Sequence, residues 1–233
     1  MKFLREITRK FKYNLKFLSK NKKIKLNYVA NSSSNSKLTE LMNFYGSDKG
    51  GRNNHHNYSE YYSELFFNER KNIKNFLEIG LGTNDVNMLS NMGEKGIPLA
   101  SLKAWRDYFD NAIIYGADID KKILKNHERI KTYFVDQTDP KTIELLFKNI
   151  GISDFDVILD DGLHDYNANI CLFENSIKFL SNSGIYIIED VYFKDKQKFI
   201  NYLNNSDYNY SIVDIYHKKN IANNCIIVIR KNI

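Results

Sequence analysis

The segment FDVILDDGLHDY, residues 155–166, places two carboxylates and a histidine directly after an apolar run. Asp160 and Asp161 are adjacent, and His164 follows Asp161 by three positions. Carboxylate oxygens suit hard divalent cations such as Mg²⁺, and histidine, with an ordinary pKa of about 6.5, can accept a proton from a substrate. These residue types are therefore suited to holding a divalent cation and to accepting a proton. His164 as a structural residue, or as a metal ligand itself, remains an alternative.

Carboxylates also end the other strands that the sequence predicts. Apolar, β-branched runs predict strands at 75–80, 112–119, 130–137, 155–161 and 184–190. The acids near their ends are Glu78, Asp118, Asp136, Asp160, Asp161, Glu189 and Asp190. Open α/β sheets bind ligands beyond the carboxyl ends of their strands, so we expect these side chains to converge on one rim. Clustered negative charge is costly without compensating cations, although the pair 189–190 can instead cap a following helix.

The order of elements predicts the architecture. Helical patterns around 99–109, 121–128, 140–149 and 167–180 alternate with these strands, which is typical of a parallel sheet covered on both faces. Two last predicted strands, 210–216 and 225–231, are joined by a polar loop and predict a hairpin at the sheet edge. We therefore predict an α/β fold, Rossmann-like and doubly wound, with a mostly parallel seven-stranded sheet and a C-terminal antiparallel hairpin. Trp105 and Tyr108 are expected in a helix core.

A glycine loop, EIGLGTND at 78–85, follows the first predicted strand. Gly80 and Gly82 permit a tight turn and close approach of a ligand to the backbone. A dinucleotide fingerprint would need glycine or alanine where Asp85 stands. With Glu78 before the glycines and Asp118 ending the second strand, the segment resembles the first motif of class I S-adenosylmethionine-dependent methyltransferases. The resemblance implies that the second-strand acid holds the ribose hydroxyls of that cofactor, and the terminal hairpin fits it.

Further motifs narrow the resemblance. YGSDKG, HHNYSEYY, SLKAWRDYF, IYGADI, RIKTYFVDQTD, FDVILDDGLH and GIYIIED follow one another over residues 45–195. In this order they resemble the sugar O-methyltransferases that act on macrolide antibiotics of the mycinamicin type, and their relatives in bacterial surface-polysaccharide clusters. The chain departs from that pattern at Leu163, where serine is common.

The resemblance implies roles for individual residues. It makes His164 the general base and Asp161, Glu189 and Asp190 the ligands of Mg²⁺ or Mn²⁺. The contacts that it implies for S-adenosylmethionine are Glu78, Gly80, Gly82, Ser101, Asp118, Asp136, Gln137 and Asp160. The implied activity is methyl transfer to a hydroxyl of a sugar or nucleotide-linked sugar, in the biosynthesis of capsule or surface polysaccharide or of a glycosylated natural product.

Other functions remain open at this point. The basic composition is compatible with a first alternative, methylation of a phosphate or phosphoramidate oxygen of a surface-glycan precursor. A non-catalytic, cofactor-binding scaffold subunit is a second alternative, which the acids and the histidine argue against. The net charge of +6 alone favours RNA methylation, and we expect no nucleic-acid partner because no RNA-recognition motif is present.

The polar, glycine-containing segment GSDKGGRNNHHNY at 46–58 is a surface connection or a lid over the site. In the second interpretation Lys49, His56 and Tyr58 face the cofactor and acceptor, and His55 or His56 is an alternative base. The two remaining histidines, at 127 and 217, are expected to be structural or at the surface.

Composition bounds the rest. The 233 residues, 42% hydrophobic and with mean hydropathy −0.49, suit one α/β domain with an appendage. Residues 1–25 form a basic amphipathic pattern that favours a helix packed on the domain or a partner subunit, with membrane-surface contact or capture of a charged substrate as alternatives. We divide the chain into this arm with its linker, 1–36, and a methyltransferase domain, 37–233. No apolar run reaches the roughly 20 residues of a membrane span. We expect the protein to be cytoplasmic and a homo-oligomer. Cys171 and Cys225 are expected to be buried thiols.

Overall fold

Seven strands form one mixed sheet in the computed structural model, which describes residues 36–52, 55–217, 220 and 222–232. The strand order is β3-β2-β1-β4-β5-β7-β6. The strands span β1 Asn75–Ile79, β2 Ile113–Asp118, β3 Ile130–Phe134, β4 Phe155–Asp160, β5 Leu180–Ile188, β6 Tyr208–Asp214 and β7 Cys225–Lys231. The first five are parallel, and β7 pairs antiparallel with both β5 and β6. The predicted Rossmann-like fold with its terminal hairpin is confirmed.

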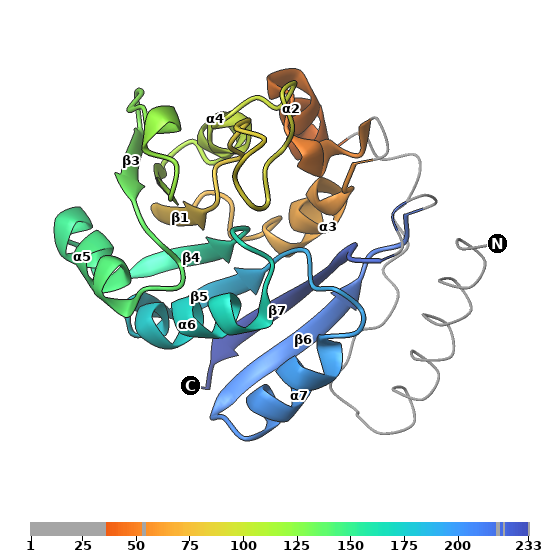
Figure 1. Ribbon diagram of the computed structural model, residues 1–233, viewed down its shortest axis with the longest axis vertical. Helices are drawn as coiled ribbons and strands as arrows, with labels where there is room; N and C mark the ends of the chain where they lie inside the picture. The colour runs from red at the N-terminus through yellow and green to blue at the C-terminus, as the bar shows by residue number, and fades with distance from the viewer. Residues whose placement is uncertain (1–35, 53–54, 218–219, 221, 233) are drawn as a thin grey trace.

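Helices cover both faces of this sheet, as Figure 1 shows. On one face lie α2 (Lys37–Tyr45), α3 (Tyr58–Leu65) and α4 (Ala100–Tyr108), and on the other α5 (Pro140–Ile150), α6 (Tyr166–Ser176) and α7 (Lys196–Asn204). Successive strand residues point to opposite faces, so Phe76 packs in the first core and Leu77 in the second. The predicted basic arm lies outside the described residues, and the proposed domain division stays a prediction.

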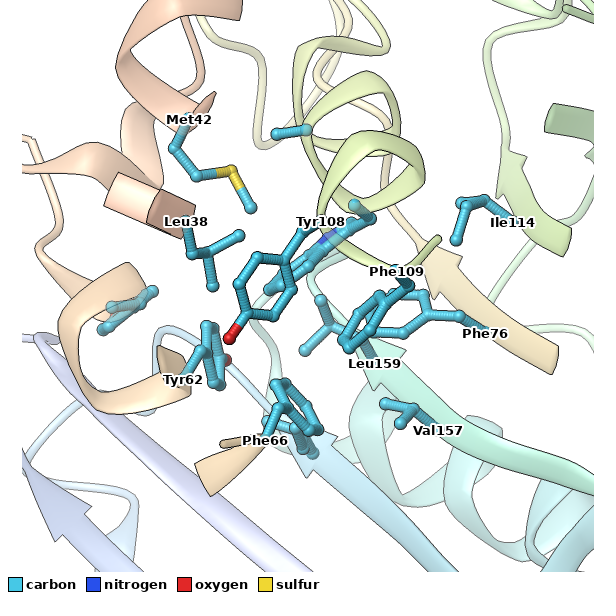
Figure 2. Close-up of a cluster of buried hydrophobic side chains, with 14 of the residues drawn as sticks. Leu38, Met42, Tyr62, Phe66, Phe76, Tyr108, Phe109, Ile114, Val157 and Leu159 are labelled. Carbon is cyan, nitrogen blue, oxygen red and sulfur yellow. The ribbon is translucent and has the colours of Figure 1, made fainter. Parts of the chain in front are cut away.

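The first core is rich in aromatic side chains (Figure 2). Trp105 on α4 is fully buried and makes edge and tilted ring contacts with Phe66 and Phe76. Tyr108 is also buried, which confirms that this helix packs in the core as predicted. Leu38 and Met42 of α2 belong to the same core, so α2 and α3 both pack against the sheet and place residues 47–49 and 56 over the carboxyl ends of the strands.

That segment contains a short 3₁₀ helix, η1 (Asp48–Gly50). Gly46 ends α2 in the left-handed region, with φ of 82°, where glycine has no steric penalty. The hydroxyl of Ser47 then accepts a hydrogen bond from the backbone N–H of Lys49 at 3.3 Å. The turn places the Lys49 side chain beneath the site described below.

Three element predictions were wrong in detail. The expected helix at 121–128 is only a 3₁₀ turn, Lys121–Ile123. Eleven residues must return from the end of β2 to the start of β3. An extended chain covers more distance per residue than a helix does, so most of this connection is not helical. The expected helix at 167–180 ends at Ser176, and β5 begins at Leu180 rather than 184. Helix α7 was not predicted. Neither cysteine forms a disulfide; Cys225 is buried as predicted, whereas Cys171 is only half-buried.

Candidate active site

A cavity of about 410 Å³ lies at the carboxyl ends of the parallel strands. The loops after β1, β2, β3, β4 and β5 all contribute to its wall, together with residues 47–49, 55 and 56. This is the crevice where open α/β sheets bind ligands, and its size suits a small molecule. Of the strand-end acids that were expected to converge on one rim, Asp118, Asp136, Asp161 and Asp190 line this cavity, whereas Glu78, Asp160 and Glu189 do not.

Three predicted residues meet at one side of this cavity. Asp161, His164 and Asp190 each offer a ligand atom, and these atoms all lie within 4.8 Å of one another. His164 Nε2 is 3.6 Å from Asp190 Oδ2. Both His164 and Asp190 have positive φ, 58° and 53°, which is uncommon for residues other than glycine and concentrates at functional sites. The backbone is therefore bent so that these two side chains face each other.

Gly80 positions Asp161. Its φ is 93°, and a Cβ atom at this position would lie 2.0 Å from the carbonyl oxygen of Asp161. The N–H of Asp161 donates to the carbonyl of Ile79 at 2.8 Å. Any side chain at 80 would push the two loops apart, so this glycine is required by the packing of the β1 loop against the end of β4 as well as by the cavity that it lines.

Lys49 lies under the same acids. Its side chain is 2% exposed, and its Nζ forms a hydrogen-bonded ion pair with Asp161 and another with Glu189 Oε2 at 2.6 Å. Glu78 Oε1 is 3.6 Å away. Burial by itself would lower the pKa of Lys49, but Asp161 and Glu189 reverse this and raise the pKa well above its ordinary value. Lys49 therefore faces the site as predicted, but as a buried cation.

Glu189 does not join the cluster that faces the cavity. Its side chain is buried; Oε2 accepts from Lys49, and Oε1 accepts from the Tyr62 hydroxyl at 2.6 Å. The structure thus brings together two of the three predicted metal ligands, Asp161 and Asp190. His164, and not Glu189, is the third residue of this cluster.

Two tyrosines on one face of α3 hold the consecutive acids after β5. Tyr58 OH donates to Asp190 Oδ1 at 2.5 Å, and Tyr62 OH donates to Glu189. Both phenols are buried, and residues four apart lie on the same side of a helix. Tyr58 was a predicted site residue, whereas Tyr62 was missed; the repeat of tyrosine at this spacing was the available signal.

His56 also approaches Asp190, at Oδ1, whereas His164 lies nearer Oδ2. Its ring stacks on Tyr58, with Nε2 3.3 Å from Asp190 Oδ1 and Nδ1 2.9 Å from Asn224 Oδ1. The Asn224 amide nitrogen donates to the carbonyl of Ile215, which fixes its oxygen toward His56. The side-chain amides of Asn224 and Asn220 thus hold the Nδ1 side of the His56 ring, and Nε2 is turned to the site.

The predicted cofactor contacts divide into two groups. Those that line the cavity are Gly80, Gly82, Ser101, Asp118, Asp136 and Gln137. Asp118 accepts from the N–H groups of Leu81 and Asp120, at 2.6 and 2.8 Å. Burial raises the pKa of Asp118, and these two hydrogen bonds oppose the shift. Asp120 itself, which accepts from the Thr83 hydroxyl at 2.7 Å, was not predicted.

The other two, Asp160 and Glu78, lie behind the cavity wall. Asp160 accepts hydrogen bonds from the side-chain amides of Gln137 and Asn169 at 2.6 and 2.8 Å, and burial raises its pKa to about 6. Gln137 also accepts from the N–H of Leu163 at 2.8 Å. This network shapes the loop that carries His164, so Asp160 acts on the site through that loop.

Glu78 is fully buried beside Lys49. Burial raises its pKa to about 7, and the Lys49 ammonium works against this shift. The position of Glu78 next to Asp161 and Lys49 ties the end of β1 to the end of β4 by charge as well as by backbone pairing.

The wall of the cavity is acidic. Aspartates at 48, 118, 136, 161 and 190 line it, whereas Lys49, whose charge is turned to the acids, is the one lysine among its described lining residues, and none of these is an arginine. Apolar side chains, among them Leu81, Ile97 and Ile119, complete the wall. A neutral or cationic ligand matches this lining better than an anion does.

The chain is similar in sequence to several curated proteins. No family model matches the chain. Among curated proteins it is 31% identical over 154 residues to 8-demethyl-8-alpha-L-rhamnosyl tetracenomycin-C 2'-O-methyltransferase of Streptomyces olivaceus, a match covering 66% of this chain and 37% of that protein. It is 30% identical over 158 residues to mycinamicin VI 2''-O-methyltransferase of Micromonospora griseorubida, covering 66% and 36%. The chain therefore spans little more than a third of the length of these relatives.

Solved structures agree with the curated relatives. The MycE methyltransferase from the mycinamycin pathway, in complex with Mg, SAH and mycinamycin VI, matches with a TM-score of 0.56 and 27% identity over 66% of this chain and 39% of that one. This chain is a homologue of sugar O-methyltransferases and has the class I methyltransferase fold. An O-methyltransferase from Bacillus cereus shares the fold alone, with a TM-score of 0.55, 13% identity, and coverage of 87% and 93%.

Within the methyltransferase fold, the residues that the sequence singled out lie where the fold binds ligands. Asp161, His164 and Asp190 form one wall of the cavity, and Asp118, Asp136 and Ser101 line it elsewhere. In the part of the chain that the structure describes, no helix is long and apolar enough to cross a membrane.

Proposed function

We propose that this chain is an S-adenosylmethionine-dependent O-methyltransferase that methylates a hydroxyl of a sugar with the help of a divalent cation. One observation carries the proposal: Asp161, His164 and Asp190 come together at the cavity of a class I methyltransferase fold. The curated relatives named above are sugar O-methyltransferases, and the MycE structure was solved with Mg and SAH, which supports the same chemistry here.

The donor set fits an oxygen-seeking ion. Mg²⁺ is commonly held by one or two carboxylates and completes its shell with water and substrate oxygens. Asp161 and Asp190 are the two cavity-lining acids that lie together with His164, so we assign the ion to them. Glu189 becomes a third ligand only if Lys49 and Tyr62 release it. When bound, such an ion lowers the pKa of an alcohol oxygen and orients a neighbouring hydroxyl.

His164 is assigned as the general base. Methyl transfer from a sulfonium is an in-line displacement: the hydroxyl oxygen bonds the methyl carbon, the carbon–sulfur bond breaks, and the hydroxyl proton must leave. His164 accepts that proton, and the resulting imidazolium is stabilised by Asp190, 3.6 Å from Nε2. We assign the donor to the part of the cavity lined by Ser101, Asp118 and Asp136, which leaves the rim near His164 for the acceptor.

The acidic lining bears on the acceptor. Even with the ion held by Asp161 and Asp190, a phosphate, a phosphoramidate or a nucleotide diphosphate would bring negative charge near three further aspartates, Asp48, Asp118 and Asp136, with no arginine among the described lining residues to receive it. We therefore favour an uncharged glycoside over a nucleotide-linked sugar or a phosphorylated glycan precursor.

The test is label transfer from S-adenosylmethionine. The purified chain is incubated with labelled donor and a panel of neutral glycosides, nucleotide-linked sugars and glycan phosphates, each with EDTA, without it, and with EDTA followed by excess Mg²⁺. We expect transfer to neutral glycosides that EDTA abolishes and Mg²⁺ restores. Undiminished transfer in EDTA contradicts the role of the ion, and preferred transfer to the anionic acceptors contradicts the choice of acceptor.

A further inference from the structure

The arrangement of acids around Lys49 is unbalanced. Its Nζ contacts Asp161 and Glu189 and lies 3.6 Å from Glu78, so one ammonium faces three carboxylates. Glu78 and Glu189 are fully buried, whereas the Asp161 side chain is 18% exposed and reaches the cavity. Asp161 thus has two faces, one bound by Lys49 and one open to a ligand.

A second buried lysine shows what a balanced pair looks like in the same fold. Lys196, at the start of α7, is fully buried and forms an ion pair with Asp214 at the end of β6. Neither residue lines the cavity. One ammonium and one carboxylate neutralise each other there, and the pair ties a helix to an edge strand.

We propose that Lys49 is a built-in cation that shares Asp161 with the catalytic divalent ion and thereby weakens the binding of that ion. The inference rests on the metal site assigned in the proposed function. Three carboxylates on neighbouring strand ends repel one another at low dielectric, and the ammonium offsets that repulsion when no ion is bound. The site therefore stays assembled without metal, at the cost of competing with the metal for the same oxygens.

Two consequences follow from electrostatics. Removing the Lys49 charge leaves the acids more negative, so the metal-free protein loses stability and the ion binds more tightly. The two effects are linked, because an ion that binds the folded chain more tightly raises the unfolding temperature by more. A lysine that only filled space and held the fold would give the first effect without the second.

The experiment compares Lys49→Met with Lys196→Met in the full chain. Binding of Mg²⁺ alone is measured by titration calorimetry, and thermal unfolding is followed with and without Mg²⁺. For K49M we expect a lower unfolding temperature without the ion and a larger rise in unfolding temperature on adding Mg²⁺. Mg²⁺ should bind about tenfold tighter or more, because one unit of positive charge is removed near a divalent ion. For K196M we expect the loss of stability with unchanged Mg²⁺ affinity.

The outcomes separate this inference from the function on which it rests. If the wild-type chain binds no divalent ion, the metal site itself is wrong and this inference falls with it. If the wild type binds Mg²⁺ and K49M binds it equally or more weakly, the site stands and the competing role of Lys49 is wrong. Should K49M not fold without metal, Lys49→Gln is used in its place, and failure of Mg²⁺ to restore folding of either variant also overturns the inference.

Discussion

Two buried lysines lie in contrasting surroundings: Lys49 in a region that is open to the cavity, and Lys196 in a region that is closed to it. In the open region Lys49 faces Asp161, Glu189 and Glu78 at the cavity, and in the closed region Lys196 faces Asp214 between α7 and β6. The closed pair is one ammonium with one carboxylate, whereas three carboxyl groups share one ammonium in the open cluster. The difference teaches that a buried ion pair does not by itself indicate a functional site. Several carboxyl groups gathered around one cation beside a cavity are a stronger indication.

The largest expected effect concerns the chemistry of the open region. His164→Ala removes the proposed base and should lower methyl transfer about 10²- to 10⁴-fold, the usual contribution of a positioned acid or base. The matched control is His127→Ala, because His127 pairs with Ile130 beside β3, away from the cavity. Steady-state rates with labelled donor provide the measurement. Unchanged turnover in H164A would show that His164 is not the base, and an absence of turnover in the wild type with every acceptor would favour the cofactor-binding scaffold instead.

The next effect concerns the closed region. Asp214→Asn leaves the Lys196 charge buried without its ionised partner and should cost about 3–5 kcal/mol in the free energy of unfolding. The double variant K196M/D214N should regain part of this loss, since it leaves no buried charge. Urea unfolding measures both, and Mg²⁺ affinity should be unchanged in both. A D214N protein with wild-type stability would show that this pair is not energetically coupled.

A smaller effect is the pH dependence that Glu78 gives to the metal-free protein. Its pKa is raised by burial to about 7, from an ordinary value of about 4.5. Between these values the folded chain keeps a proton that the unfolded chain has released, so stability falls as pH rises through this window and is level above it. Over the whole window the loss is about 3 kcal/mol. Glu78→Gln should remove this component, as urea unfolding at pH 5 and pH 8 would show; an equal pH dependence in both proteins would contradict it.

The smallest effects compare one hydroxyl in each region. Tyr58→Phe removes a hydrogen bond to the carboxylate of Asp190 and should cost about 1.5–3 kcal/mol, with altered Mg²⁺ affinity. Tyr210→Phe removes a hydrogen bond to Asn204 between β6 and α7 and should cost about 1 kcal/mol, with the ion affinity unchanged. Thermal unfolding and calorimetry measure the two quantities. Equal effects on the ion in both variants would erase the distinction between the regions.

Much of the fold was predictable because its signals are local. Alternating strand and helix patterns fixed the parallel sheet, and the polar loop before the last strand fixed the antiparallel hairpin. Helix α7 escaped prediction because its apolar residues, Phe199, Ile200 and Leu203, are few and lie among lysines and asparagines. The turn at 121–123 was overestimated because periodicity does not register how far the chain must travel between strands.

The candidate site was predictable to the level of strand ends, and no further. Pairs of acids after β4 and β5 were visible in sequence, but one member of each pair faces the cavity and the other turns away. Asp161 and Asp190 line the cavity, whereas Asp160 binds Gln137 and Asn169 and Glu189 binds Lys49. Beyond the last strand residue, side-chain direction depends on the loop backbone, as the φ of 53° at Asp190 shows.

The sequence by itself determined which chemistry-bearing residues gather at one edge of the sheet, because the ends of parallel strands must meet there. Only the tertiary structure decided what each of them touches. Lys49 and Tyr62 reach the acids from segments more than a hundred residues away, through the packing of α2 and α3 on the sheet. Contacts of that kind depend on how α2 and α3 pack against the sheet, which no local pattern of residues specifies.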